Sequence, residues 1–90
     1  MVKANKLTQL QVSRIKEAGM HGDGAGLWLK VTAGGSKSWI LRYTMAGRER
    51  WTGLGPYPDV SLVEARDKAM AWRKQVRAGA DPMKAKQEAL

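Results

Sequence analysis

Cysteine is absent from the 90 residues, which excludes a disulfide framework and a thiolate metal site. This absence fits a protein of a reducing cytoplasm. No stretch approaches the run of about 20 apolar residues that a transmembrane helix needs. The polar segment at residues 1–9 also lacks the apolar core of a secretory signal. We therefore expect a cytoplasmic protein with no membrane partner.

Groups for catalysis or metal binding are equally scarce. The one histidine, His21, lies in a glycine-rich segment with no second histidine and no run of carboxylates beside it. The eight acidic residues are scattered along the chain. They provide neither paired carboxylates nor a nucleophile with an adjacent base. The sequence therefore predicts a domain that is not an enzyme and that holds no metal and no cofactor.

Acidic residues are few compared with basic ones. Sixteen Lys and Arg residues against eight Asp and Glu residues give a formal net charge of +8. This balance favours a polyanionic partner, and nucleic acid is the first candidate. A solvated basic surface and an anionic membrane are the alternatives. The membrane is the weaker of the two, because no helix pairs a basic face with a broad apolar face.

A capping signal near the N-terminus predicts a short helix. Thr8 suits the N-cap position, and Gln11 three residues later completes a capping box. The helix is expected to run to about Ala18, where Gly19 can end it. A glycine-rich loop is expected at residues 20–26. Its G-x-G-x-G spacing fits a phosphate-binding fingerprint poorly, because the loop precedes a strand instead of opening a helix.

Alternating side chains predict three strands, at residues 27–32, 38–44 and 48–54. The connections at residues 33–36 and 45–47 are short, so the strands should form an antiparallel meander. Residues 55–59 contain two prolines and are expected to leave the sheet, because proline lacks the backbone donor that a central strand needs.

The best-marked helix begins at Ser61, where Glu64 completes a second capping box. Gly79 is expected to end it. Its apolar residues recur at spacings of three and four and form one stripe of an amphipathic helix, namely Leu62, Ala65, Ala69, Trp72 and Val76. The predicted fold class is therefore α+β, with a three-stranded antiparallel β-sheet packed on a C-terminal α-helix and a short N-terminal helix.

The chain is expected to divide at about residue 80. Residues 1–80 are long enough for one domain with one modest core. Asp81 and Pro82 restart helical signals. Residues 81–90 are therefore expected to begin a linker or helix, and the 90 residues to be a piece of a longer protein.

The predicted sheet has two unlike faces. One is apolar and can pack the stripe of the long helix, with Leu27, Leu29, Val31, Trp39, Leu41, Tyr43 and Trp51. The opposite face combines basic, hydroxyl and apolar side chains, namely Trp28, Lys30, Thr32, Ser38, Ile40, Arg42, Thr44, Arg48, Arg50 and Thr52, with Lys37 in the turn region beside it.

A sheet face in contact with water is expected to be polar, so a solvated face is one interpretation. The nearly uniform sign of the charge, and the apolar Trp28 and Ile40, favour a nucleic-acid surface instead. Arginine can read a guanine edge, apolar groups can meet a thymine methyl, and lysine can neutralise phosphate. The major groove also admits a β-ribbon. We therefore take this second face, Lys37 included, as the candidate DNA-binding set.

Five sequence blocks follow one another in order: Leu7-Thr8, GLWLKV at 26–31, GSKSWILRY at 35–43, GLGPYP at 53–58 and SLVEAR at 61–66. Together they resemble the N-terminal domain of phage-type integrases of the tyrosine recombinase family, which occur in prophages and genomic islands. The resemblance covers about residues 6–82 and includes the closing Gly-Ala-Asp-Pro.

The resemblance implies a domain that binds double-stranded DNA at arm-type sites flanking the recombination core, with its sheet in the major groove. It points to Lys30, Arg42, Arg48, Arg50 and their threonine neighbours as contacts. It also implies a core-binding and catalytic region after residue 90, in a parent tyrosine recombinase of the bacterial nucleoid. The family's nucleophilic tyrosine belongs to that region, so these 90 residues are expected to lack strand exchange.

Three positions depart from the family pattern: Ala46 in the second turn, Trp51 and Pro56. They leave open whether Arg48 or Glu49 faces the DNA.

A second hypothesis is a protein-interaction module. It would contact another integrase subunit or an accessory DNA-bending protein, through Trp28 and Ile40 or through the first helix. A stand-alone DNA-binding regulator is the expectation if no recombinase follows residue 90.

Overall fold

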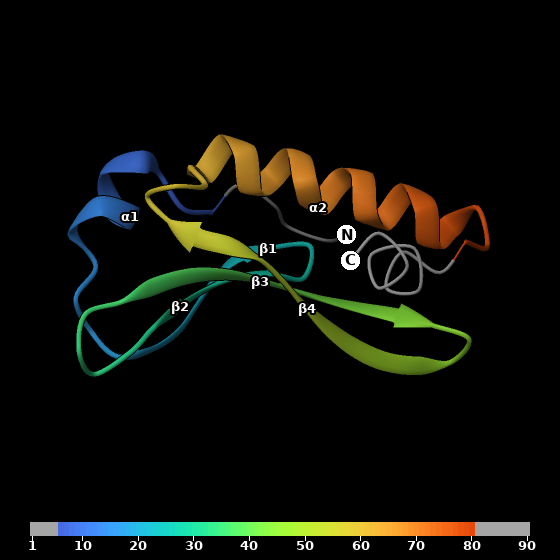
Figure 1. Ribbon diagram of the computed structural model, residues 1–90, viewed down its shortest axis with the longest axis horizontal. Coiled ribbons are helices and arrows are strands. Elements are labelled where there is room, and N and C mark those ends of the chain that lie inside the picture. Colours follow the sequence, from blue (N-terminus) through green and yellow to red (C-terminus); the bar gives the residue numbers. More distant parts are fainter. Residues whose placement is uncertain (1–5, 81–90) are drawn as a thin grey trace.

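Four antiparallel strands form one sheet, and two helices lie on the same side of it (Figure 1). This computed structural model describes residues 6–80. The expected α+β class and antiparallel sheet are confirmed, but the sheet has four strands and not three. The helical restart expected at residues 81–90 lies outside the described residues. The elements are α1 (Gln9–Arg14), β1 (Gly19–Gly24), β2 (Leu27–Val31), β3 (Lys37–Met45), β4 (Arg48–Tyr57) and α2 (Leu62–Arg77).

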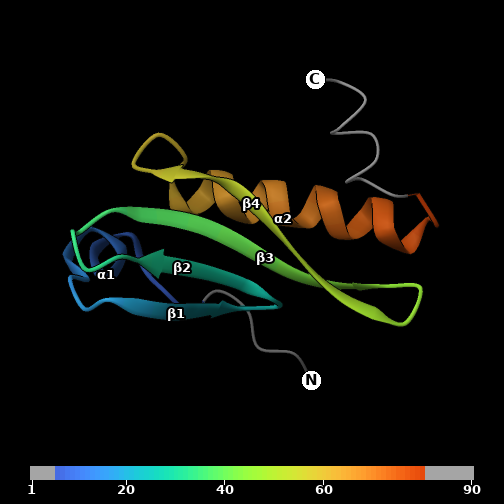
Figure 2. The same cartoon turned by 60° about the horizontal axis from the view of Figure 1, so that its bottom comes forward.

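The additional strand is β1, which the sequence predicts as a loop. It lies along β2 at one edge of the sheet, with Gly22 opposite Trp28 (Figure 2). Glycine has a low strand propensity and no side chain to alternate, so β1 carries no periodic signal. The turn into β2, Ala25-Gly26, has φ values of 55° and 85°. Two positive φ values are typical of the two-residue turns that match the twist of paired strands.

α1 ends earlier than expected, at Arg14 and not near Ala18. Its predicted capping box is confirmed, because the Thr8 hydroxyl accepts a hydrogen bond from the Gln11 N–H at 3.1 Å. Ile15 then adopts extended backbone angles and ends the helix.

Lys37 stabilises this early end of α1. Its Nζ donates hydrogen bonds to the carbonyl oxygens of Val12 at 2.8 Å and Ser13 at 3.1 Å. Carbonyls in the last turn of a helix have no partner within the helix. The ammonium group also lies 5.5 Å from the centre of the Tyr57 ring. Lys37 is the first residue of β3, and its side chain lies on the helix side of the sheet. The prediction of a turn residue beside the opposite face is therefore wrong.

The hydrophobic core lies between the sheet and the helices. Trp39 is at its centre and fully buried, and its indole N–H donates to the Val60 carbonyl at 2.7 Å. α2 has the predicted capping box at Ser61, and four residues of its predicted apolar stripe, Leu62, Ala65, Ala69 and Trp72, belong to the core or pack against it. The buried apolar residues are Val12, Leu27, Leu29, Val31, Trp39, Leu41, Tyr43, Leu62, Ala65 and Ala69.

The register of β4 is opposite to the predicted one. The β3–β4 turn has two residues, Ala46 and Gly47, with φ values of 51° and 76°, whereas the prediction used a turn of three. Met45 therefore pairs with Arg48, and a change of one residue moves every following side chain to the other face. Arg48, Arg50 and Thr52 lie on the helix side, and Glu49, Trp51 and Gly53 lie on the opposite side.

β4 also continues to Tyr57, although its prolines predicted an exit from the sheet. β4 is an edge strand, with a neighbour on one side only. An edge strand tolerates a residue without a backbone donor, and Pro56 is such a residue in β4. A bulge at Leu54, opposite the step from Trp39 to Ile40, adds one residue to β4.

Candidate nucleic-acid interface

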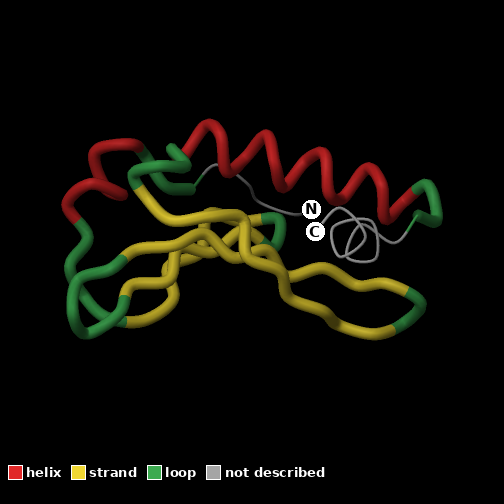
Figure 3. Tube along the Cα trace, viewed as in Figure 1, coloured by secondary structure: helices red, strands yellow, loops and turns green. Residues whose placement is uncertain are grey.

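The face of the sheet that points away from α1 and α2 is called the outer face. No helix of residues 6–80 covers it, and all of the strands contribute to it (Figure 3). Residues that pair across strands share a face. The register therefore identifies its members as Met20, Gly22, Trp28, Lys30, Ser38, Ile40, Arg42, Thr44, Glu49, Trp51, Gly53 and Pro56.

Part of the predicted site lies together on this face. The residues concerned are Trp28, Lys30, Ser38, Ile40, Arg42 and Thr44. They come from β2 and β3, the central strands, along which buried and less buried side chains alternate.

Arg48 and Arg50 lie on the helix side of β4, contrary to the prediction. They pair with Met45 and Tyr43 near the end of the β3–β4 hairpin, and both are exposed. This end of the hairpin extends beyond β1 and β2 (Figure 2). The two arginines therefore lie near the end of the hairpin and not within the outer face.

Three other predicted residues have local structural contacts. Thr52 is 4% exposed and pairs with Leu41, so it belongs to the core side. The Thr32 hydroxyl accepts a hydrogen bond from the Ser36 N–H at 3.1 Å in the β2–β3 turn. The Lys37 ammonium group is held by α1.

Trp51 lies on the outer face, whereas the sequence predicts it for the core: it is 46% exposed and lies directly opposite Arg42. Of Arg48 and Glu49, which the sequence leaves open, Glu49 is the outer-face residue. The Arg42 guanidinium carbon is 6.0 Å from the centre of the Trp51 ring, within the range of a cation–π contact. Its Nη1 is also 3.8 Å from Glu49 Oε1. The Ala46-Gly47 turn, read as a two-residue turn, would have revealed both.

The outer face is consequently less basic and more apolar than predicted. Its charged members are Lys30, Arg42 and Glu49. Trp28 and Ile40 are partly buried, and the Trp28 ring lies against Gly22, where an added β-carbon would be 3.2 Å from the ring. Aromatic and aliphatic groups thus occupy the middle of the face.

A buried ion pair fixes the scaffold behind this face. Asp23 is 1% exposed and accepts hydrogen bonds from Arg66 Nε at 2.9 Å and Nη2 at 2.8 Å. The same carboxylate accepts from the Leu7 N–H at 2.9 Å, and Arg66 also donates to the Leu7 carbonyl at 2.7 Å. The hydrogen bonds to Asp23 raise the pKa of the Arg66 guanidinium. The pair therefore joins the segment before α1, strand β1 and helix α2.

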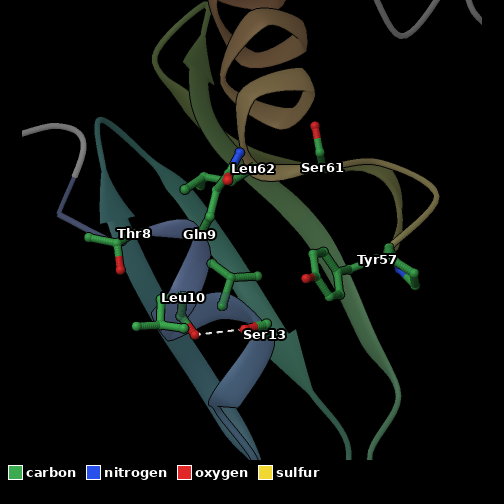
Figure 4. A pocket seen from close by; sticks show the side chains of 9 residues that line it. Thr8, Gln9, Leu10, Ser13, Tyr57, Ser61 and Leu62 are labelled. Atoms are coloured by element: carbon green, nitrogen blue, oxygen red, sulfur yellow. Dashed lines mark hydrogen bonds between the residues drawn. The ribbon is translucent and has the colours of Figure 1, made fainter.

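A second apolar surface lies on the helix side, between α1, the end of β4 and the start of α2 (Figure 4). This hollow has a volume of about 820 Å³ and is lined by Leu10, Tyr57 and Leu62 among others. Leu10 is 58% exposed. None of the described residues that line the hollow is charged.

The described residues do not include a cluster of metal-binding side chains. Residues 6–80 contain no group of three or more His, Asp or Glu side chains arranged to hold a metal ion. His21 Nε2 is 2.9 Å from the Glu17 carbonyl oxygen and serves a local contact. Neither helix of this part of the chain has the length and apolar character needed to span a membrane.

Comparison with known proteins identifies the family. A family model described as "Arm DNA-binding domain" matches residues 5–89. The chain is 50% identical over 64 residues to the integrase of Shigella phage Sf6, and equally to the prophage integrase IntS of Escherichia coli K12. Each of these matches covers 71% of this chain and 17% of the relative. The integrase of Enterobacteria phage P4 is 38% identical over 69 residues, covering 74% of this chain and 16% of the relative. The chain thus spans about a sixth of the length of these curated relatives.

Proposed function

Because the chain belongs to the arm DNA-binding domain family, we propose that it binds double-stranded DNA with the outer face of its sheet in the major groove. In this proposal it holds a longer integrase on arm-type sites during site-specific DNA integration. The integrases that it resembles are about six times as long as the matched segment, so strand cleavage is assigned to a region outside these residues, in a tyrosine recombinase of the bacterial cytoplasm.

The observation that carries the proposal is the uncovered outer face, formed by β2, β3 and β4 beside the edge strand β1. Neighbouring strands lie about 4.8 Å apart, so three strands span about 10 Å. The major groove of B-DNA is about 12 Å wide. A sheet with its helices on the other side can enter this groove without a clash between helix and backbone.

The chemistry of the face fits this position. Arg42 can take the O6 and N7 atoms of a guanine with two hydrogen bonds. Ser38 and Thr44 supply hydroxyl groups on the same face of β3, and Lys30 can neutralise a phosphate. We assign Trp28 and Ile40 to apolar contacts with bases.

The remaining predicted residues take other places in the proposal. Arg48 and Arg50 are assigned to the phosphate backbone, because they lie at the end of the hairpin and not in the middle of the face. Thr32 lies in a turn at the margin of the face. Lys37 and Thr52 are assigned to the scaffold, because both point to the helix side.

The test is binding of the chain to a random library of labelled duplexes, followed by fluorescence anisotropy on the selected sequences. The binding constant is expected to fall steeply with salt, because neutralised phosphates release counterions. Replacement of a contacted guanine by 7-deazaguanine, which lacks the N7 acceptor of the major groove, is expected to weaken binding. Undetectable binding at about 50 mM salt would overturn the proposal, and equal affinity for every 7-deazaguanine duplex would overturn its groove assignment.

A protein-interaction role is the second candidate, and the apolar hollow beside α1 favours it. Leu10 is an exposed apolar residue there, and such surfaces are typical of contact sites. Another integrase subunit or an accessory DNA-bending protein would be the partner. Sedimentation of the chain without DNA tests self-association: a mass that rises with concentration, and that Leu10→Ser lowers, supports this role.

A further inference from the structure

A shallow hollow opens on the outer face between β3 and β4. Its volume is about 500 Å³, and the side chains of Ile40, Trp51 and Pro56 form its apolar walls. Lys30 and Ser38 line the side nearer to β2. Because the hollow faces away from the helices, it belongs to the surface that the proposed function places in the major groove.

Gly53 creates the hollow. It pairs with Ile40 on the outer face, where any other residue would project a side chain. A β-carbon built at Gly53 meets no atom within 4 Å, and its φ lies outside the left-handed region. The backbone there does not require glycine, and the glycine leaves space between Trp51 and Pro56 that a side chain would fill.

We propose that this hollow receives the 5-methyl group of one thymine, an inference that rests on the proposed function. The thymine methyl is the apolar group that base pairs present in the major groove. The walls of the hollow are apolar, whereas Lys30 lines its side and Arg42 lies next to Trp51. Apolar walls with Lys30 at one side are complementary to a methyl group that lies among phosphates and polar base edges.

The charge of the chain favours DNA over an apolar protein segment as the occupant. The net charge is +8, and on the face that carries the hollow the two cations Lys30 and Arg42 outnumber the one acid, Glu49. In this arrangement Gly53 is a specificity-determining position, because it leaves room for thymine and not because it makes a contact itself.

The test removes single methyl groups from the DNA. A duplex is first selected from a random library by the 90-residue chain, and each of its thymines is then replaced in turn by deoxyuridine, which lacks only the methyl. One position is expected to lose about fourfold in affinity, the value for one buried methyl group. The other positions are expected to change less than twofold.

A matched pair of variants tests whether the sensitive thymine lies in the hollow. Gly53→Val fills the hollow and is expected to lower affinity for the thymine duplex and to abolish the difference between thymine and deoxyuridine. Gly34→Val is the control, since Gly34 lies in the β2–β3 turn, and a β-carbon there makes only one ordinary contact, 4.0 Å from Thr32 Oγ1. It should retain the fourfold difference. Circular dichroism spectra establish that both variants are folded.

The outcomes separate the inference from the function on which it rests. If selected duplexes bind but no deoxyuridine substitution weakens binding of the original chain, the thymine site is wrong and DNA binding stands. The site is also wrong if Gly53→Val retains the full effect of the methyl group. If no duplex is selected at all, the proposed function fails and this inference fails with it.

Discussion

Replacement of Asp23 by asparagine tests how far the outer face depends on the buried ion pair behind it. The Asp23 carboxylate accepts two hydrogen bonds from Arg66 and one from the Leu7 N–H. Asparagine keeps the shape but removes the charge and turns one acceptor into a donor. The Arg66 guanidinium then faces a neutral amide group in place of a carboxylate.

The magnitude follows from the burial of the two partners. Removing one partner of a buried ion pair lowers the free energy of unfolding by about 3–5 kcal/mol. The Arg66 side chain retains 27% of its exposure, against 2% for Asp23, so water solvates part of its charge. We therefore expect a loss of about 2–3 kcal/mol in the free energy of unfolding. For a domain of this size, that loss lowers the melting temperature by roughly 10–20 °C.

Thermal unfolding followed by circular dichroism measures this difference. Asp67→Asn is the matched control, since Asp67 is the exposed neighbour of Arg66 on α2, and an exposed substitution of this kind changes stability by less than about 0.5 kcal/mol. Equal melting temperatures for the two variants would refute the role given to Asp23.

The pH dependence of the pair has a definite sign. The hydrogen bonds to Asp23 raise the folded-state pKa of the Arg66 guanidinium above its ordinary value. A raised pKa contributes stability that is complete below the unfolded pKa and is lost as the pH rises through the folded pKa. Arg66 therefore contributes no change in melting temperature between about pH 7 and pH 10.

Four further variants test the ends of elements and the DNA contacts. Lys37→Met leaves the last carbonyls of α1 without their partner and is expected to cost about 1–2 kcal/mol in urea unfolding, with the salt dependence of DNA binding unchanged. Gly26→Ala is expected to destabilise by at least about 1 kcal/mol in the same assay, because its φ is 85° and a β-carbon there would be 2.3 Å from the Arg42 carbonyl oxygen. Arg42→Ala is expected to cost about 1–3 kcal/mol at one guanine and to relax the preference for it. Arg48→Ala should instead weaken binding to all sequences alike and reduce the slope of log K against log salt by about 1. Binding to guanine-substituted duplexes at several salt concentrations separates these two results.

The elements that the sequence predicts correctly carry their signals locally. α2 is marked by the Ser61 capping box and by apolar residues at helical spacing, and both survive in the structure. In β2 and β3, every second residue from Leu27 to Val31 and from Trp39 to Tyr43 is apolar, because one face of each strand packs on the core. The outer-face positions of Lys30 and Arg42 follow directly from that alternation.

The errors arise where distant contacts or turn length decide the outcome. β1 is held as a strand by pairing with β2, which compensates for its glycines. α1 ends where Lys37, more than 20 residues later, reaches its carbonyls. Asp23 and Arg66 are 43 residues apart, so no local pattern joins them.

The reversed register of β4 has the largest consequence for function. It removes Arg48 and Arg50 from the middle of the face and brings Trp51 and Glu49 there instead. Phosphate contacts hold a protein on DNA without carrying sequence information, whereas contacts to base edges carry it. Arg42 lies between an aromatic ring and a carboxylate, so its guanidinium loses less rotational freedom when it takes a guanine. In the proposed complex, this register therefore places an oriented arginine and an apolar hollow against the bases, and leaves Arg48 and Arg50 to contact phosphates from the end of the hairpin.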